Sequence, residues 1–326
     1  MHLRRAALVF VGLVLLVSGS ARAAEVRYFS VPESDHPHDV TPAPDGTVWY
    51  TGQQAGVLGQ LDPKNGKVER IPLGEGSAPH GVIVGPYGAA WVTDSGLNAI
   101  LRVDPRTKEV KTWPLPTTRA NSSLNTAAFD GEGRIWFTGQ RGIYGRLDPA
   151  TGAMTIWDAP KGVGPYGITA TPDGQIYYVS LAGSFLGKVD LENGATTVIE
   201  PPTRQAGTRR VWSDSKGRLW ISEWNAGNIA MYDPKSASWK TYRLPGDGPH
   251  AYAIYVDDKD KVWVSDFGEN AILGFDPTSE TFQSFPSDHR DAAVRQMAGR
   301  AGEVWGAESG TDRLVVIRYG AGDLSN

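Results

Sequence analysis

Apolar segments return along this chain in a long, regular repeat. Each copy contains four short apolar segments, and the second of them carries a large aromatic residue. Successive aromatic positions are 42, 45, 41, 43, 43 and 42 residues apart, and they are Trp49, Trp91, Trp136, Tyr177, Trp220, Trp263 and Trp305. Repeats of about 40–50 residues with several short strands are typical of β-propellers, with one four-stranded blade per repeat. The pattern therefore predicts an all-β fold, a seven-bladed β-propeller whose aromatic residues pack between blades.

Turn residues stand at fixed places between the apolar segments. An Asp-Gly pair follows the first segment in three copies, at Asp45-Gly46, Asp130-Gly131 and Asp173-Gly174. Glycine accepts the positive φ of a tight hairpin, and a proline ends a strand without wasting a ladder donor. The third segment ends in Asp-Pro five times, at Asp62-Pro63, Asp104-Pro105, Asp148-Pro149, Asp233-Pro234 and Asp276-Pro277. We interpret these aspartates as turn formers rather than as a ring of ligands.

The two ends of the chain complement each other. Residues 25–32 resemble the fourth segment of the other repeats, such as residues 68–72 and 282–286, whereas the final repeat lacks a fourth segment. An N-terminal strand that completes the last blade would close the ring and hide edges that could otherwise aggregate. The sequence therefore predicts that the N-terminal strand joins blade seven.

The first residues read as a secretory signal. Arg4 and Arg5 precede an apolar run over residues 6–17, and small residues end at Ala21-Arg22-Ala23. This three-part pattern predicts a signal peptide over residues 1–23 and a single propeller domain over residues 24–326. The chain contains 0 Cys, so neither disulfides nor a lipid-bearing cysteine is expected. A periplasmic or secreted location follows from this interpretation.

The net charge of the chain limits the classes of binding partner that we expect. Removal of the predicted signal, which carries three arginines, changes the formal net charge from −4 to −7. Nucleic acid and anionic membranes call for a concentrated basic face, so neither is an expected partner of the mature chain. Composition favours a monomer that binds a small molecule in the central funnel of the propeller.

Function is expected where equivalent positions of the repeats differ, at one end of the channel. One such column lies at the start of each first strand and reads His38, His80, Asn125, Tyr166, Arg209, then His250 or Tyr252, then Val294 or Arg295. Three of the 6 His of the chain fall in this column. Neutral imidazole near pH 7 serves as a base or as a metal ligand, so we expect these histidines to be functional.

A second column lies three residues after each aromatic position. It reads Gly52, Asp94, Gly139, Ser180, Glu223, Asp266 and Glu308, with three carboxylates in consecutive blades. Carboxylates that point inward need a cation, an arginine or a raised pKa. Hard oxygen ligands favour Mg²⁺ or Ca²⁺, and histidine would permit other divalent ions. Alternatively, each carboxylate pairs with a backbone N–H or with Arg209, Arg210 or Arg295 and ties blades together.

These repeats resemble the virginiamycin B lyase (streptogramin lyase) family of seven-bladed propellers. The resemblance is carried by Pro79-His80-Gly81, Pro165-Tyr166-Gly167, Trp136-Phe137-Thr138 and Tyr144-Gly145-Arg146-Leu147-Asp148. It implies linearisation of a cyclic depsipeptide antibiotic by β-elimination, with a base that takes the α-proton and Mg²⁺ that stabilises the enolate-like charge. By the resemblance, His250 matches the active-site histidine of blade six, and Glu308 most nearly matches the glutamate of the last blade.

The chain departs from the family pattern in blade seven. Arg295 stands where the family has its general base, and Ala293 stands where it has a metal-binding glutamate. An arginine cannot act as a base near neutral pH. Either His38 or His80 takes over the role of base, with Glu223 and Asp266 helping to hold the metal, or the reaction has been lost or changed.

Three functions remain open at this point. The first is an exported Mg²⁺-dependent C–O lyase, with His250, His80 or His38 as base and Glu308 among the metal ligands. The second is a metal-dependent lactonase in which Glu308, Glu223 and Asp266 hold an ion that activates water. The third is a non-catalytic propeller that binds a small anionic or aromatic molecule or a protein. Its funnel would be lined by Tyr166, Arg209, Asn125, Arg295 and Tyr252.

Overall fold

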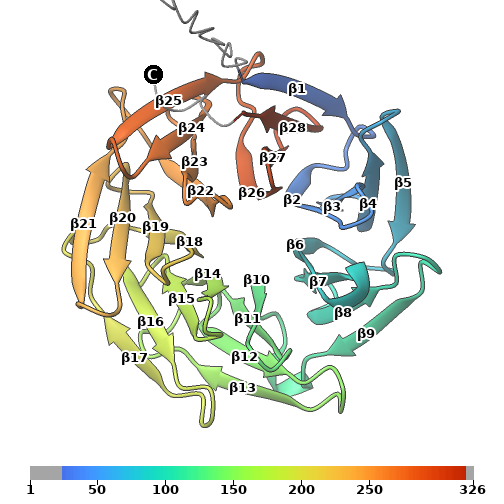
Figure 1. Ribbon diagram of the computed structural model, residues 1–326. Helices are drawn as coiled ribbons and strands as arrows, with labels where there is room; N and C mark the ends of the chain where they lie inside the picture. The colour runs from blue at the N-terminus through green and yellow to red at the C-terminus, as the bar shows by residue number, and fades with distance from the viewer. Residues whose placement is uncertain (1–23, 321–326) are drawn as a thin grey trace, which may run out of the picture.

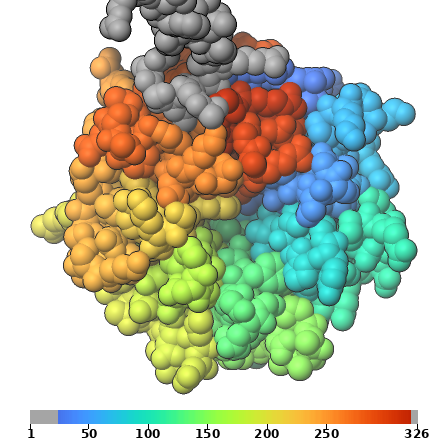
Figure 2. Space-filling view, viewed as in Figure 1, coloured from blue at the N-terminus to red at the C-terminus, as the bar shows by residue number. Residues whose placement is uncertain are grey.

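The computed structural model describes residues 24–320, which form a ring of seven four-stranded antiparallel sheets (Figure 1). The first strand of each sheet lies innermost, around the axis, and the fourth lies at the outside. The space-filling view shows the blades packed side by side in chain order around the centre (Figure 2). The predicted seven-bladed β-propeller is confirmed.

Strand bounds follow the repeat closely. Blades 1 to 3 contain β2 (Pro37–Pro42), β3 (Val48–Gly52), β4 (Val57–Asp62) and β5 (Lys67–Pro72); β6 (Pro79–Val84), β7 (Ala90–Asp94), β8 (Ala99–Val103) and β9 (Val110–Pro114); and β10 (Leu124–Phe129), β11 (Ile135–Gly139), β12 (Ile143–Leu147) and β13 (Met154–Asp158). Two short 3-10 helices, η1 (Pro86–Gly88) and η2 (Thr117–Arg119), lie in connections.

The remaining blades repeat the arrangement. Blades 4 to 6 contain β14 (Pro165–Ala170), β15 (Ile176–Ser180), β16 (Phe185–Val189) and β17 (Thr196–Ile199); β18 (Thr208–Ser213), β19 (Leu219–Glu223), β20 (Asn228–Asp233) and β21 (Ser238–Arg243); and β22 (Ala251–Val256), β23 (Val262–Asp266), β24 (Ala271–Asp276) and β25 (Thr281–Pro286). Blade 7 contains β26 (Val294–Arg300), β27 (Glu303–Glu308), β28 (Arg313–Arg318) and β1 (Glu25–Ser30).

The ring closes through the N-terminal strand, as the sequence predicted. β1 pairs antiparallel with β28, from Glu25 opposite Arg318 to Ser30 opposite Arg313. Phe29 of β1 is buried and stacks on Trp305 of β27, with ring centroids 5.5 Å apart. A strand from one end of the chain therefore shares both hydrogen bonds and core packing with the other end.

The aromatic positions are buried and are tied to the turns. Trp136, Trp220 and Trp263 are at most 1% exposed. Each donates its indole N–H to the aspartate six residues earlier, at distances of 2.8, 3.1 and 3.0 Å. The same aspartates accept backbone N–H groups of their turns. One carboxylate thus fixes both a hairpin and the large ring behind it, which explains why the two recur together.

The turn predictions hold with one adjustment. In every Asp-Pro pair the aspartate Oδ1 accepts the N–H two residues later, at 2.8–3.0 Å. The turn glycines Gly46 and Gly174 have φ of 93° and 82°. In the turn that begins at Asp130, the positive φ of 78° belongs to Gly133 rather than to Gly131. In that turn the residue with the left-handed backbone conformation is therefore Gly133, two positions after the glycine of the Asp-Gly pair.

The predicted signal peptide, residues 1–23, lies outside the described residues. Within residues 24–320, no helix has the length and apolar character needed to cross a membrane.

Candidate functional site

A bulge in each first strand aims side chains at the axis. In all seven blades the pairing of the first and second strands shifts register just after its first residue pair. Such bulges re-aim side chains. The residue after that first pair is the axial position of each blade, and the seven are His38, His80, Asn125, Tyr166, Arg209, Tyr252 and Arg295.

This register decides between the two pairs that the sequence left open. Ala251 pairs with Asp266, so blade 6 contributes Tyr252 to the ring, and His250 lies before the strand. Val294 pairs with Glu308, so blade 7 contributes Arg295. The ring therefore contains two histidines, not three, because Tyr252 and not His250 follows the first pair of blade 6, at the same distance from the aromatic residue as His38 and His80 in their blades.

A hydroxyl on the second strand clamps most of these bulges. Thr51 accepts the N–H of Asp39 at 2.9 Å and donates to the carbonyl of His80 in the next blade at 2.8 Å. Equivalent hydroxyls do the same in blades 2, 3, 5 and 6, from Thr93, Thr138, Ser222 and Ser265. The carbonyls of four axial residues are thus bonded to the preceding blade, namely those of His80, Asn125, Tyr166 and Tyr252.

A buried ion pair crosses the channel between blades 5 and 1. Arg210 of blade 5 donates to Asp39 of blade 1 at 3.0 Å and to Thr126 of blade 3 at 2.7 Å. Arg210 and Asp39 are 4% and 1% exposed. Burial opposes the charge, but the Asp39 carboxylate together with Tyr166 and Tyr252 outweighs burial and raises the pKa of Arg210. Sequence reasoning missed Asp39 and Thr126, although both directly follow axial positions and are polar.

The two axial histidines lie in contact in this network, with their ring planes tilted by 45°. Their ring centroids are 3.8 Å apart, and His38 Nδ1 contacts Asp39 Oδ1 at 2.8 Å. His80 donates from Nδ1 to the carbonyl of Asn125 at 3.1 Å, and its Nε2 accepts from the Asn125 amide at 3.2 Å. Burial, with contributions from Arg210, holds the pKa of each histidine well below its ordinary 6.5. Both are therefore neutral at pH 7, and His80 has no free lone pair.

Stability should consequently fall as the pH drops below 6.5. There the unfolded chain protonates His38 and His80 while the folded chain does not, so protons favour unfolding. Each histidine should remove about 1.4 kcal/mol of unfolding free energy per pH unit until its lowered pKa is reached. Urea unfolding at intervals between pH 7.5 and 5.5 measures this slope. Burial also lowers the pKa of the partly buried His36, so His80→Gln should reduce this slope by less than half, whereas His289→Gln, at an exposed histidine, should leave it unchanged.

A tyrosine pair spans the channel between blades 4 and 6. The hydroxyls of Tyr166 and Tyr252 are 2.7 Å apart, and the Arg209 guanidinium lies 4.9 and 3.7 Å from their ring centroids. Burial raises the pKa of Tyr166 to about 12. For Tyr252 burial also opposes ionisation, but Arg209 and Arg210 outweigh it and lower its pKa. At this level the axis is filled by bonded side chains.

The accessible part of the site lies on blades 5 to 7. We call it the mouth and define it as Arg209, Trp224, His250, Phe267 and Arg295. The Trp224 ring stacks on His250 at 4.9 Å, meets Phe267 edge-on at 5.4 Å, and lies 4.9 Å from the Arg209 guanidinium. His250 is exposed, and the other four are partly exposed. The mouth therefore joins cations to an aromatic surface.

Trp224 and Phe267 were not predicted as site residues. Each directly follows a member of the carboxylate column, Glu223 or Asp266, where the other blades have no aromatic residue. That difference between repeats was the available signal.

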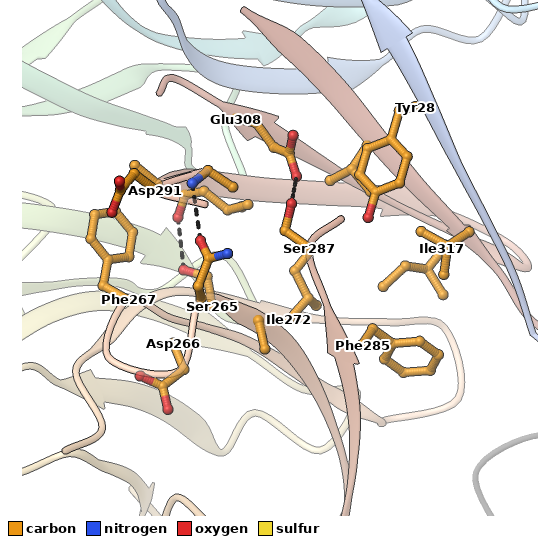
Figure 3. Close-up of a pocket in the computed structure, with 17 residues that line it drawn as sticks. Tyr28, Ser265, Asp266, Phe267, Ile272, Phe285, Ser287, Asp291, Glu308 and Ile317 are labelled. Carbon is orange, nitrogen blue, oxygen red and sulfur yellow. Dashed lines mark hydrogen bonds between the residues drawn. The ribbon is translucent and has the colours of Figure 1, made fainter. Parts of the chain in front are cut away.

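The carboxylate column does not converge on one point. Glu308 accepts from Arg313 at 2.6 and 2.9 Å and from Ser287 at 3.0 Å. Asp266 accepts backbone N–H groups of His250 and Gly268 at 2.8 and 2.9 Å. Figure 3 shows Glu308 and Asp266 on separate sides of a pocket.

Glu223, the third predicted metal ligand, is also held locally. Its Oε2 accepts from the Asn228 amide at 3.2 Å, and burial raises its pKa. The structure therefore realises the alternative in which each carboxylate is bonded near its own blade, although the partners are not the arginines named from the sequence.

The residues present do not fit the Mg²⁺ that the family resemblance implies. Within residues 24–320, the only set of three or more His, Asp or Glu ligand atoms within 4.8 Å of one another is His38, Asp39 and His80. It offers one carboxylate, already bonded to Arg210 and His38. Mg²⁺ and Ca²⁺ prefer several oxygen ligands, and a guanidinium at this carboxylate opposes a second cation.

Comparison with known proteins places the fold. Residues 17–272 match the model of the virginiamycin B lyase family. The propeller superposes on a streptogramin B lyase with a TM-score of 0.83 at 22% identity, covering 91% of this chain and 98% of the other. It superposes on a catalytically inactive virginiamycin B lyase from Staphylococcus aureus with quinupristin with a TM-score of 0.82 at 20% identity, covering 90% and 99%.

The same fold extends to a more distant structure, YCF48 bound to D1 peptide. Its TM-score is 0.69 at 17% identity, with 92% of this chain and 96% of that chain covered. No curated protein has a significant sequence match to the chain.

Proposed function

This chain belongs to the virginiamycin B lyase family, and we propose that its propeller binds a small molecule with an anionic group at the mouth. The solved relative that holds quinupristin supports a small organic ligand on this scaffold. The departures of this chain from the family pattern support an anion: the axial position of blade 7 is Arg295, and the mouth also presents Arg209.

The observation that carries the proposal is a pair of guanidiniums without carboxylate partners. Within residues 24–320, neither Arg209 nor Arg295 forms an ion pair. Arg295 donates from Nε to Ser309 at 2.7 Å, and Arg209 reaches only the Tyr166 hydroxyl, at 3.4 Å. The Arg209 Nε is buried and has no partner. Unpaired guanidiniums in a partly desolvated site favour a carboxylate or phosphate, which they bind through charge-assisted hydrogen bonds.

The aromatic residues beside these cations would bind the apolar part of the ligand. Trp224, His250 and Phe267 form one aromatic cluster, in which Trp224 stacks on His250 and meets Phe267 edge-on, with ring centroids 4.9 and 5.4 Å apart. A ligand ring or apolar group would lie against this stack while its anionic group meets Arg209. The ligand class is thus a small anion attached to an aromatic or apolar body.

Ligand binding should therefore depend on Arg209. Benzoate serves as the probe, and benzyl alcohol as its neutral counterpart, in titrations followed by calorimetry and tryptophan fluorescence. Arg209→Met should weaken benzoate binding about 10- to 100-fold, since a hydrogen bond to a charged group contributes about 1.5–3 kcal/mol. Arg141→Met, at an exposed arginine outside the mouth, is the matched control. Equal affinities of wild type and Arg209→Met for benzoate would refute the proposal.

A C–O lyase is the second candidate function, and one observation favours it. His250 donates from Nδ1 to the carbonyl of Trp224 at 3.2 Å, so its exposed ring keeps the Nε2 lone pair free. That is the form in which a histidine takes a proton. In a β-elimination, Nε2 would take the α-proton of a threonyl ester, a C=C bond would form, and the carboxylate would leave as the C–O bond breaks.

Mass spectrometry of a type B streptogramin incubated with the protein separates the candidates. A linear product of unchanged mass that is lost in His250→Gln supports the lyase. A product heavier by one water indicates a hydrolase of the lactonase kind. If the antibiotic is unchanged and benzoate binding depends on Arg209, the mouth is a binding site and a type B streptogramin is not a substrate.

Export and oligomeric state belong to the proposal as well. The predicted signal peptide supports a periplasmic or secreted protein, and the composition supports a monomer.

A further inference from the structure

A cavity of about 400 Å³ lies at the seam between blades 4 and 5. We call it the lysine pocket. Its walls come from β15 and β16 and from the turns that follow β14, β18 and β20. These turns follow the first and third strands of their blades, whereas the mouth is formed where the first strands begin. The lysine pocket therefore lies on the opposite face of the ring from the mouth.

The charges of the pocket are mainly positive. Lys188, Lys216 and Lys235 line it and are exposed. Within residues 24–320, none of these three lysines forms an ion pair. One carboxylate lies in the wall, that of Asp173, whose Oδ1 accepts the Thr171 hydroxyl at 2.5 Å. Three lysines against one aspartate leave the pocket with two positive charges in excess.

Tyr177 adds a hydrogen-bond donor to the wall. The residue is 3% exposed, and within residues 24–320 its hydroxyl has no hydrogen-bond partner. Unlike the unpartnered hydroxyls of Tyr178 and Tyr319, this one is not sealed from solvent. Burial raises the pKa of Tyr177 to about 12, so the hydroxyl keeps its proton at neutral pH. A ligand oxygen in the pocket can accept that proton in a hydrogen bond.

Comparison with the other blades shows how the sequence opens this cavity. Tyr177 is the only one of the seven repeated aromatic residues that is not a tryptophan. It packs against blade 5 as Trp136 of blade 3 packs against blade 4. Protein interiors are closely packed, so a ring smaller than indole at this seam leaves volume unfilled.

Blade 4 also lacks a charge pair that its neighbours have. In blade 3, Asp130 lies six residues before Trp136 and binds Arg134 at 2.7 Å, and blade 5 has the same pair. Thr171 and Gln175 hold these two places in blade 4. The seam has therefore lost a carboxylate close to the lysines, and their charge is left for a ligand.

We propose that the lysine pocket binds a phosphorylated small molecule, with its phosphate oxygens at Lys188, Lys216 and Lys235 and one of them bonded to the Tyr177 hydroxyl. Lysine binds phosphate as a point charge, and a phosphate monoester carries about −1.5 to −2 at pH 7, which matches the excess charge of the wall. The volume lies in the range of about 300–1,000 Å³ that is usual for small-molecule sites. The site is separate from the mouth and does not depend on its function.

Inorganic pyrophosphate is the probe, titrated into the mature protein by calorimetry and by thermal unfolding. Physiological ionic strength screens the weak attraction between isolated surface charges and the probe. We expect saturable binding, with acetate at least tenfold weaker. Because the probe binds the folded protein, the melting temperature should rise with its concentration.

Replacement of the lysines tests the charge of the wall. Lys188→Met and Lys235→Met should each lower pyrophosphate affinity at least fivefold. Lys64→Met is the matched control, because Lys64 is exposed and follows Asp62-Pro63 in blade 1 as Lys235 follows Asp233-Pro234 in blade 5. This control should leave the affinity unchanged.

Two further variants test the cavity and the hydroxyl. Tyr177→Trp supplies the ring that the other blades have, so it should fill the cavity and lower the affinity at least tenfold while all three lysines remain. Tyr177→Phe removes only the hydroxyl and should lower the affinity at least threefold. Circular dichroism confirms that each variant is folded.

The mouth is tested separately. Arg209→Met should bind pyrophosphate like the wild type, and Lys188→Met should bind benzoate like the wild type. The absence of saturable binding, equal losses in Lys188→Met and Lys64→Met, or full affinity in a folded Tyr177→Trp would each overturn the proposal. A loss of pyrophosphate binding in Arg209→Met would also overturn it, because the anion would then lie at the mouth.

Discussion

Arg210→Met is expected to lower the free energy of unfolding by about 3–5 kcal/mol. Arg210 is 4% exposed and is the counter-charge of Asp39, which is 1% exposed. The substitution leaves a buried carboxylate without its cation and the Thr126 hydroxyl without its donor. Because these three residues belong to blades 5, 1 and 3, the substitution removes contacts that link three separate blades. Urea-induced unfolding followed by tryptophan fluorescence measures it.

A double variant separates the lost charge balance from lost packing. Asp39→Asn with Arg210→Met removes both charges, so much of the loss should be recovered relative to Arg210→Met alone. Arg141→Met, at an exposed arginine, should change stability by less than about 0.5 kcal/mol. If the double variant is no more stable than Arg210→Met, the ion pair does not explain the loss.

Trp263→Ala is expected to destabilise the protein by a similar amount, about 3–5 kcal/mol. The ring is fully buried at the contact of blades 6 and 7, where it packs against Phe285 and Tyr319 with centroids 5.7 and 5.1 Å away. Its removal leaves a large cavity and also strips Asp257 of the indole donor at 3.0 Å. Thermal and urea unfolding both report the change.

Trp263→Phe separates the contribution of the indole hydrogen bond from that of the buried ring. It keeps most of the buried ring but still removes the indole N–H, so it should fall between wild type and Trp263→Ala. A loss below about 1 kcal/mol for Trp263→Ala would mean that this aromatic position does not hold the blades together.

The axial residues show how a family scaffold can change its chemistry. Blade 6 places Tyr252 at the axis and leaves His250 at the exposed mouth, while blade 7 places Arg295 there. Where the family pattern implies an acidic metal site with a base, this chain has guanidiniums, neutral imidazoles and a tyrosine pair. The two candidate functions follow from this exchange, since guanidiniums attract anions whereas a free imidazole lone pair takes protons.

The sequence by itself determined the number of blades, the closure of the ring and the turns. The number of blades and the turns arise from residues close together in the chain, such as an aspartate and the tryptophan six residues later. The closure of the ring was predicted differently, because residues 25–32 resemble the fourth segment that the last repeat lacks. Features that repeat with a fixed period can be predicted from the sequence without knowing which distant residues are in contact. The axial column was found for the same reason, because in blades 1 to 6 each member stands at one offset from its aromatic residue, and in blade 7 Arg295 is one residue closer.

Only the tertiary structure decided what these residues do. A register shift selected Tyr252 over His250, and Arg210 meets Asp39 from 171 positions away in the chain. Glu308 pairs with Arg313, and a pocket at the seam of blades 6 and 7 is lined in part by the first and last strands, which become neighbours only in the fold. Charge pairing and cavities depend on which blades become neighbours across the ring, and spacing along the chain does not carry that information.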